Sequence, residues 1–173
     1  MPVRGKGPAA PREPSATAVS TATRTVFSLS EQETLDLGRR TARQLQPGDL
    51  LVLEGDLGTG KTVFVRGVAD GLGVPPADVT SPSFTLVHEY RGGRVRLFHV
   101  DLYRVETAED LMTIGLDEIL ASGAVVAVEW GERLPPVYRR DAVTVRFHDA
   151  GEGARRIEVV ARRDRSRRPS GDA

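Results

Sequence analysis

The sequence has no cysteine and no asparagine, and only two of its 24 basic residues are lysines, Lys6 and Lys61. The absence of cysteine excludes disulfides and thiolate-bound metal sites. No run of 18 apolar residues is present, which excludes a membrane-spanning helix. The first residues carry positive charges but no apolar stretch behind them, so we expect no secretory signal and a cytoplasmic location.

Charge is balanced over the whole chain but unevenly distributed along it. The 173 residues carry 24 basic and 24 acidic side chains. Residues 1–24 have a net charge of +3, from four bases and one acid, and residues 162–173 also have +3, from five arginines and two aspartates. The remaining 15 bases and 21 acids give residues 25–161 a net charge of −6. Such a body is a poor partner for nucleic acid, so any RNA contact would have to use the two ends or another protein.

Composition divides the chain into three parts. Residues 1–24 are rich in Pro, Ala, Ser and Thr, which predicts a disordered N-terminal extension. Residues 162–173 predict a disordered basic tail. Between them, residues 25–161 alternate short apolar strand candidates with helical segments, which predicts one folded domain.

Two strand candidates, residues 50–53 and 125–128, are apolar throughout, a pattern typical of strands buried on both faces. Helices are predicted to start after Ser30 and after Thr107, because Glu33 and Asp110 follow at the spacing of a capping box. Residues 26–29 are a short strand candidate, and residues 84–90 and 94–100 are two more on either side of a Gly-Gly turn. Residues 143–147 and 157–160 predict a final antiparallel hairpin. Together these elements predict an α/β sheet that is covered by helices on both faces.

One segment carries the chemistry: it reads Gly55-Asp56-Leu57-Gly58-Thr59-Gly60-Lys61-Thr62 and matches the phosphate-binding pattern G-x-x-x-x-G-K-[ST]. A buried strand candidate precedes it and a helix candidate follows, as this motif requires. Backbone N–H groups from Asp56 to Thr62 would surround the phosphates of ATP. Lys61 would reach the β- and γ-phosphates, and the Thr62 hydroxyl would bind Mg²⁺. The expected fold class is therefore α/β, a P-loop NTPase-like mixed sheet with helices on both faces and a C-terminal antiparallel hairpin.

Two acidic residues follow predicted strands that would neighbour the P-loop strand. Asp101 ends the strand candidate over residues 94–100, and Glu129 ends the one over residues 125–128. A carboxylate in this position can bind Mg²⁺ or orient the attacking water. We favour Glu129 for the Mg²⁺ shell, because its strand is the more uniformly apolar. For Asp101 we expect a shared metal-binding or water-orienting role.

Several other residues are candidates of lesser weight. The loop over residues 80–85 has four hydroxyl side chains around a proline and is interpreted as a switch that senses the γ-phosphate. Arg104 has the chemistry to stabilise a transferred phosphoryl group, although a structural role is the more frequent one. Trp130, the only tryptophan, follows Glu129 and is interpreted as a lid, a docking surface or a core residue. The histidines are interpreted as ordinary strand residues.

The order and spacing of these motifs resemble the TsaE (YjeE) family of P-loop ATPases of bacterial tRNA threonylcarbamoyladenosine (t6A) biosynthesis. Besides the P-loop, the similarity rests on four short runs, which read Thr34-Leu35-Asp36-Leu37-Gly38, Ser81-Pro82-Ser83-Phe84-Thr85-Leu86-Val87, His99-Val100-Asp101-Leu102-Tyr103-Arg104 and Val128-Glu129-Trp130.

This resemblance implies a slow Mg²⁺-dependent ATPase that supports two partner proteins, TsaB and TsaD, which transfer threonylcarbamoyl to adenosine 37 of tRNA. Contact with tRNA would be indirect, through that complex, and no membrane contact is implied. The resemblance assigns Lys61, Asp101 and Glu129 to catalysis, and Thr62 with both acids to the metal. It also places Glu31 and Trp130 beside the nucleotide.

Three other functions share part of this sequence pattern. A GTPase would recognise guanine with N-K-x-D, which a chain without asparagine cannot supply. A small-molecule P-loop kinase needs an acceptor site and usually an arginine-bearing lid, whereas the residues after 125 read as hairpin strands. A binding module in which ATP only sets a conformation would share every motif and would differ only in turnover.

Overall fold

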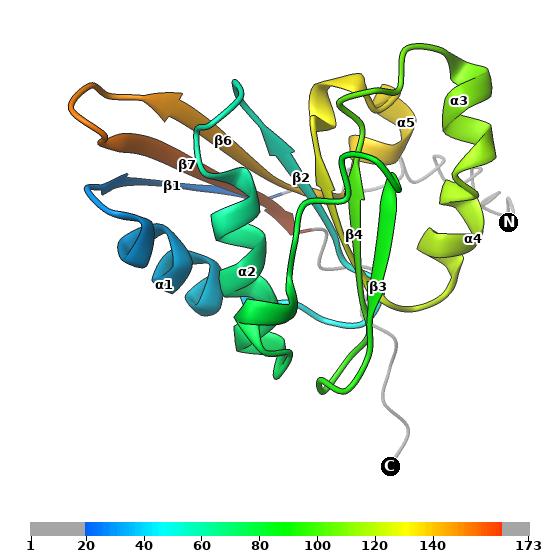
Figure 1. The fold of residues 1–173 in the computed structure, drawn as a ribbon, viewed down its shortest axis with the longest axis horizontal. Helices are drawn as coiled ribbons and strands as arrows, with labels where there is room; N and C mark the ends of the chain where they lie inside the picture. The colour runs from blue at the N-terminus through cyan, green and yellow to red at the C-terminus, as the bar shows by residue number, and fades with distance from the viewer. Residues whose placement is uncertain (1–19, 164–173) are drawn as a thin grey trace, which may run out of the picture.

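The computed structural model describes residues 20–163, which form one seven-stranded mixed sheet in the order β1-β7-β6-β2-β5-β4-β3 (Figure 1). The strands are β1 (Ser20–Ser28), β2 (Leu50–Glu54), β3 (Val87–Tyr90), β4 (Leu97–Asp101), β5 (Val125–Glu129), β6 (Val143–Asp149) and β7 (Arg155–Arg163). The helices are α1 (Glu31–Ala42), α2 (Lys61–Leu72), α3 (Ala108–Thr113), α4 (Leu116–Ala121) and α5 (Pro136–Arg139), with short 3₁₀ turns η1 (Pro76–Asp78) and η2 (Gly131–Arg133). No helix in this described part of the chain is long and apolar enough to cross a membrane.

The four central strands, β4, β5, β2 and β6, run parallel, and antiparallel strands flank them on both sides. All five residues of β5 are buried, as its uninterrupted apolar run predicts for a strand covered on both faces. Because parallel strands end on the same side, the carboxyl ends of β2, β5 and β4 meet at one edge of the sheet. This edge is where the P-loop begins.

Helices α1 and α2 cover one face of the sheet and cross each other at close range. A Cβ atom on Gly38 would lie 2.2 Å from the Phe64 carbonyl oxygen, and one on Gly67 would lie 2.0 Å from that of Leu35. Only glycine allows the two backbones to come so near. The cluster beneath them includes Phe64, Leu51 and Ile157, all fully buried. The position of α2, and with it the end of the P-loop, is therefore set by backbone contact.

The opposite face is covered by α3, α4 and α5, which pack on Val52, Val126 and Val128. Helices on both faces of a mixed sheet confirm the predicted fold class (Figure 1). The predicted C-terminal hairpin is also confirmed, with β6 and β7 antiparallel. Two capping interactions start helices as expected: the Ser30 side chain accepts from the Glu33 backbone N–H, and Thr107 forms a capping box with Asp110.

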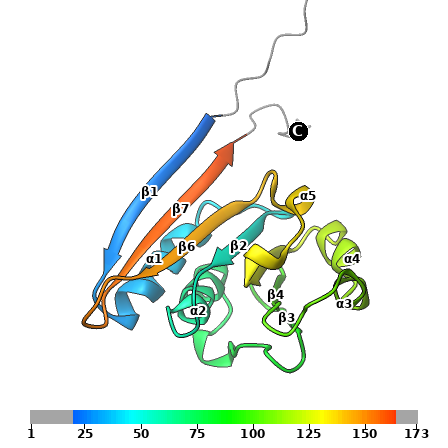
Figure 2. The ribbon, with the colours of Figure 1, turned by 90° about the horizontal axis from the view of Figure 1, so that it is seen from above.

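Strand β1 is longer than the sequence pattern indicates. It begins at Ser20, inside the segment expected to be disordered, and pairs antiparallel with β7 as far as Arg163 (Figure 2). Residues 20–24 and 162–163 thus belong to the sheet, because each strand satisfies the other's backbone hydrogen bonds without needing apolar side chains at every position. The rest of the two predicted disordered segments, residues 1–19 and 164–173, lies outside the described residues.

Strand β3 is shorter than predicted. The expected strand started at Phe84, but β3 begins at Val87. Before it the chain makes a turn in which the Leu86 N–H donates to the Pro82 carbonyl at 2.7 Å, and Leu86 has a positive φ of 65°. This turn leaves Phe84 82% exposed and projects the loop over residues 80–85 from the sheet edge.

Candidate functional site

The P-loop connects the buried strand β2 to α2 in the geometry of a phosphate cradle. Gly60 caps the helix with a φ of 100°, a left-handed conformation that residues with a side chain rarely adopt. Gly55 has a φ of 136°, and a Cβ there would lie 2.5 Å from the Phe147 carbonyl oxygen. The first N–H groups of α2 have no partner within the helix, and they face the loop with the positive end of the helix dipole. An anion is the ligand that such an arrangement favours.

Lys61, the first residue of α2, is only 4% exposed and points back across the loop. Its Nζ donates to the carbonyl oxygens of Gly55 at 2.6 Å and Asp56 at 2.7 Å. It also lies 4.4 Å from the centroid of the Trp130 ring, within reach of a cation–π interaction. Burial lowers the pKa of Lys61, while nearby carboxylates, chiefly that of Glu129, act in the opposite direction. The ammonium is thus held in place by groups that a phosphate can replace.

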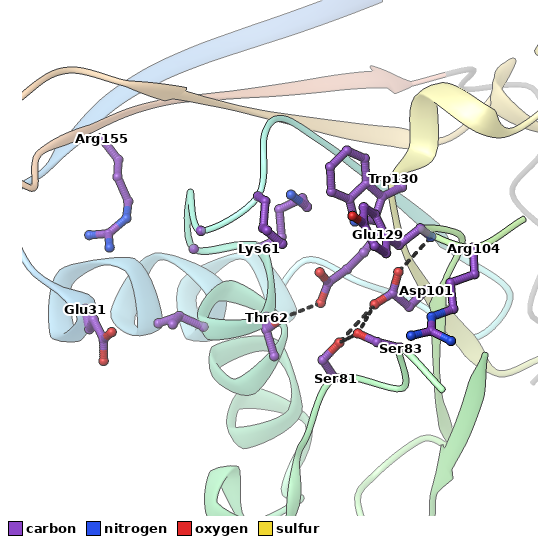
Figure 3. A pocket seen from close by; sticks show the side chains of 15 residues that line it. Glu31, Lys61, Thr62, Ser81, Ser83, Asp101, Arg104, Glu129, Trp130 and Arg155 are labelled. Atoms are coloured by element: carbon purple, nitrogen blue, oxygen red, sulfur yellow. Dashed lines mark hydrogen bonds between the residues drawn. The ribbon is translucent and has the colours of Figure 1, made fainter. Parts of the chain in front are cut away.

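The two predicted acids lie side by side at the end of the sheet, because Asp101 of β4 and Glu129 of β5 are register partners. Both are almost fully buried, 2% and 4% exposed. The Thr62 hydroxyl donates to Glu129 Oε1 at 2.8 Å, which connects the P-loop helix to β5 (Figure 3). This hydrogen bond uses the proton of the hydroxyl and leaves the oxygen lone pairs free for a cation.

Asp101 is bonded to the loop over residues 80–85. Its Oδ2 accepts from the hydroxyls of Ser81 at 2.9 Å and Ser83 at 2.8 Å, and its Oδ1 accepts from the Tyr103 backbone N–H at 2.9 Å (Figure 3). The proposed switch loop and the second acid therefore form one hydrogen-bonded unit. A ligand that binds Asp101 Oδ2 would compete with these hydroxyls for its lone pairs.

These residues fit Mg²⁺ better than a metal that needs a complete protein cage. Among the described residues no group of three or more His, Cys, Asp or Glu could hold a metal ion by itself. Mg²⁺ keeps several waters and is usually bound by one or two carboxylates together with substrate phosphates. Glu129, Asp101 and the Thr62 hydroxyl provide such a partial set of oxygen ligands next to the phosphate cradle.

A cavity of about 450 Å³ opens in front of the P-loop. Its lining includes nine of the eleven residues predicted for the site, namely Glu31, Leu57, Gly58, Gly60, Lys61, Thr62, Asp101, Glu129 and Trp130. The other two, Asp56 and Thr59, do not line it, and the Thr59 hydroxyl instead donates to the Asp56 carbonyl at 2.7 Å within the loop. Glu31 lies on the α1 side of the cavity and Trp130 on the β5 side (Figure 3).

Two residues of this site were not predicted. His99 is fully buried, and its Nε2 lies 2.8 Å from Glu129 Oε1, the atom that also accepts from Thr62. The signal was present in the alternation of β4, which puts His99 and Asp101 on the same face. Arg155 lines the cavity from the start of β7, and a Cβ on Gly60 would lie 3.0 Å from its Nε. No local pattern indicates this arginine, because the hairpin brings it to the P-loop from 95 positions further along the chain.

The sequence model of the family "Threonylcarbamoyl adenosine biosynthesis protein TsaE" matches residues 28–157. The chain belongs to the TsaE family. The match includes the whole site, from Glu31 on α1 to Arg155 on β7, and it excludes both basic ends, residues 1–24 and 162–173.

Curated relatives and a solved structure agree with this assignment. The tRNA threonylcarbamoyladenosine biosynthesis protein TsaE of Treponema pallidum is 40% identical over 77% of this chain and 97% of its own length. The proteins of the same name from Bacillus subtilis and Streptomyces coelicolor are 39% and 43% identical, over 78% and 72% of this chain and over 83% and 86% of their own lengths. The crystal structure of B. subtilis YdiB superposes with a TM-score of 0.67 at 34% identity, covering 86% of this chain and 91% of that one. This TsaE-family chain therefore takes part in t6A biosynthesis.

Proposed function

We propose that the chain is a Mg²⁺-dependent ATPase and an accessory subunit of the cytoplasmic complex that modifies adenosine 37 of tRNA, acting with TsaB and TsaD. The observation that carries the ATPase proposal is the hydrogen bond from the Thr62 hydroxyl to Glu129. It joins the P-loop to an acid on the adjacent parallel strand, which is the arrangement of the metal-binding residues in P-loop NTPases. The printed names of the relatives support the place in t6A biosynthesis.

Each residue of the site has a role in this proposal. The backbone amides of the P-loop and the ammonium of Lys61 bind the β- and γ-phosphates, with Lys61 exchanging its carbonyl partners for phosphate oxygens. Thr62 and Glu129 would hold the Mg²⁺, and the bound ion would supply positive charge against the charge that develops on the phosphates. Asp101 orients the attacking water, since it is the second acid at the same edge of the sheet.

The loop over residues 80–85 would transmit the state of the nucleotide to a partner. Asp101 holds Ser81 and Ser83, so a change at Asp101 moves the loop. The same loop contains Phe84, which is 82% exposed. The centroid of its ring lies 4.4 Å from Cζ of Arg104. A large exposed aromatic ring next to a nucleotide-sensitive loop provides a surface that a protein partner could recognise.

The decisive experiment measures ATP hydrolysis by the chain alone and with purified TsaB and TsaD, together with multiple-turnover t6A formation on tRNA. We expect slow release of phosphate by the chain alone, acceleration by the two partners, and t6A turnover that needs the chain. If phosphate passed efficiently to a small acceptor in the absence of those proteins, the small-molecule kinase would be the correct assignment. Nucleotide binding without any hydrolysis would favour the binding module.

His99 is expected to be a positioning residue for Glu129. A carboxylate can only accept hydrogen bonds, so the imidazole Nε2 donates to Glu129 Oε1 and restricts the rotation of the carboxylate. In the His99→Leu variant we expect kcat for ATP hydrolysis to fall about tenfold. Loss of a residue that orients a metal ligand typically lowers activity 10- to 100-fold. Nucleotide binding without Mg²⁺ should change less than about twofold, since His99 lies behind the carboxylate.

Two further variants separate positioning from packing. His99→Gln keeps an amide donor at similar reach and is expected to recover most of the lost kcat. His88→Leu serves as the matched control, because His88 pairs with His99 across β3 and β4 but its Nδ1 lies 3.1 Å from the Tyr90 hydroxyl and its ring does not contact Glu129. An equal loss in the Leu and Gln variants of His99 would show that only the imidazole's packing matters.

A further inference from the structure

The loop over residues 80–85 begins at Thr80, and both backbone groups of this residue are bonded to one side chain. The Thr80 N–H donates to the Tyr90 hydroxyl oxygen at 3.2 Å, and the Thr80 carbonyl accepts from the same hydroxyl at 3.3 Å. A hydroxyl has one proton and two lone pairs, so both bonds can form at once. The second lone pair is available to His88 Nδ1, which lies 3.1 Å away. The Tyr90 hydroxyl thus holds the point at which the loop leaves the core.

Tyr90 is itself well fixed. It is the last residue of β3, and its ring packs against the buried cluster that contains Val79 and Leu97. Leu97 is also its register partner on β4. The hydroxyl is therefore presented to Thr80 by a ring that the sheet and the core hold in place.

The residue before Thr80 is held from the P-loop helix. Arg66 lies one turn after Thr62 on α2, and its Nε donates to the Val79 carbonyl at 3.0 Å. The Val79 side chain is 1% exposed. The beginning of the loop is therefore attached to two elements, the helix that follows the P-loop and the strand at the edge of the sheet.

The residue after Thr80 is one of the two serines that hold Asp101. The hydroxyls of Ser81 and Ser83 donate to Asp101 Oδ2 at 2.9 and 2.8 Å (Figure 3). Consecutive Cα atoms are a fixed distance of about 3.8 Å apart, so the position of Thr80 largely sets that of Ser81. A shift of about 1 Å would take the Ser81 hydroxyl out of hydrogen-bonding range of the carboxylate.

The other end of the loop is fixed independently of Tyr90. The Leu86 N–H donates to the Pro82 carbonyl at 2.7 Å, and the Leu86 carbonyl accepts from the Asp101 N–H at 3.0 Å. Between the two ends, Phe84 is 82% exposed. The bonds of the Tyr90 hydroxyl are therefore the side-chain contacts that hold Thr80 itself.

We propose that Tyr90 is a positioning residue of the ATP site: by fixing Thr80, its hydroxyl keeps Ser81 and Ser83 in reach of Asp101 and so orients that carboxylate. This inference rests on the proposed function, in which Asp101 orients the attacking water. Tyr90 is not among the residues that line the ATP cavity, so its influence has to pass through the loop. The rate of hydrolysis should accordingly depend on Tyr90 more than nucleotide affinity does.

The first test is the variant Tyr90→Phe, which removes the hydroxyl and keeps the ring. We expect kcat for ATP hydrolysis to fall about fivefold, a factor typical of losing a neutral hydrogen bond. The affinity for ATP should stay within about twofold of wild type, because the P-loop is untouched. The matched control is Tyr138→Phe, which removes a hydroxyl that bonds to Asp117 at 3.0 Å on the opposite face of the sheet. It should retain the kcat of the wild type.

A double-mutant cycle tests whether Tyr90 acts through the serines. In the Ser81→Ala/Ser83→Ala background the groups that connect the loop to Asp101 are absent, so adding Tyr90→Phe should lower kcat by less than about 1.5-fold further. The same fivefold loss in both backgrounds would show that the hydroxyl acts by another route, and would overturn the proposal.

Amide hydrogen exchange of the full chain without nucleotide tests the anchor apart from catalysis. Peptides covering residues 80–86 should exchange about fivefold faster in Tyr90→Phe than in the wild type, and Tyr138→Phe should leave them unchanged. Unaltered exchange in Tyr90→Phe would show that its hydroxyl does not hold the loop. A wild-type chain without ATPase activity would refute the proposed enzyme, whereas normal turnover with an equal kcat in Tyr90→Phe would refute only the role of Tyr90.

Discussion

Replacing Lys61 with methionine is expected to weaken ATP binding by at least about 100-fold and to abolish measurable hydrolysis. Removing one partner of a buried, hydrogen-bonded charge pair costs roughly 2 to 5 kcal/mol, and 2.7 kcal/mol corresponds to about 100-fold in affinity. Methionine keeps most of the volume of the lysine side chain, so the packing around Trp130 should persist. Calorimetric titration with ATP and Mg²⁺ measures the affinity, and phosphate release measures turnover.

The matched control for this variant is Lys6→Met, which removes the other lysine of the chain. It should bind and hydrolyse ATP like the wild type. Unchanged ATP turnover in Lys61→Met, with the fold intact by circular dichroism, would contradict the assignment of the P-loop as the phosphate site.

Because Lys61 must be charged to attract phosphate, the affinity for ATP is expected to fall at alkaline pH. Burial lowers the pKa of Lys61 from its ordinary value of 10.5, so the ammonium loses its proton at a lower pH than a free lysine does. Only the charged form attracts phosphate, and affinity is therefore expected to fall as pH rises through this lowered pKa. Titrations with ATP at a series of pH values from 7 to 11 measure the effect, and an affinity that stays constant through pH 10.5 would contradict it.

Replacing Glu129 with glutamine is expected to reduce kcat about 100-fold, the order of magnitude lost when one group that stabilises developing charge is removed. The amide still accepts hydrogen bonds from Thr62 and His99, so the local structure should persist. Its neutral oxygen is a much weaker ligand for Mg²⁺ than a carboxylate. ATP binding without Mg²⁺ should remain within about threefold of wild type, whereas the Mg²⁺ concentration needed for half-maximal turnover should rise.

Glu132→Gln is the control for Glu129→Gln. Glu132 is exposed in the turn η2, three residues after Glu129, and its charge also reaches Lys61. If loss of negative charge near Lys61 were sufficient, both variants would lose activity equally. A selective loss in Glu129→Gln would assign the effect to the carboxylate that bonds Thr62.

Local sequence patterns predicted the central elements because their signals are strong and short in range. The apolar runs of β2 and β5 require burial on both faces. The Ser30 and Thr107 caps start helices through hydrogen bonds between residues only three positions apart. The predictions at the edges of the sheet were less accurate. Strand β1 begins at Ser20 because β7 pairs with it, and β3 begins after a turn whose bond joins Leu86 to Pro82.

The residues of the site also fall into those that local sequence patterns predicted and those that depend on strand pairing. Lys61 and Thr62 are adjacent in a motif whose glycines adopt the positive φ angles of the loop. The sequence alone could therefore predict that the two side chains lie at the P-loop. The partners of the two acids were not, because Ser81 and Ser83 reach Asp101 from a loop and His99 reaches Glu129 from the neighbouring strand. These contacts depend on how β4 and β5 pair, which no short segment specifies.

The sequence by itself predicted a P-loop between a buried strand and a helix, and two acids at the ends of strands beside it. These features follow from glycine conformation, apolar periodicity and charge, which act over a few residues. Only the tertiary structure decided that Glu129 is the acid bonded to Thr62, that Arg155 faces the P-loop, and that β1 pairs with β7 along its whole length. These arrangements join residues up to 143 positions apart, from Ser20 to Arg163, and the pairing of strands in one sheet brings them together.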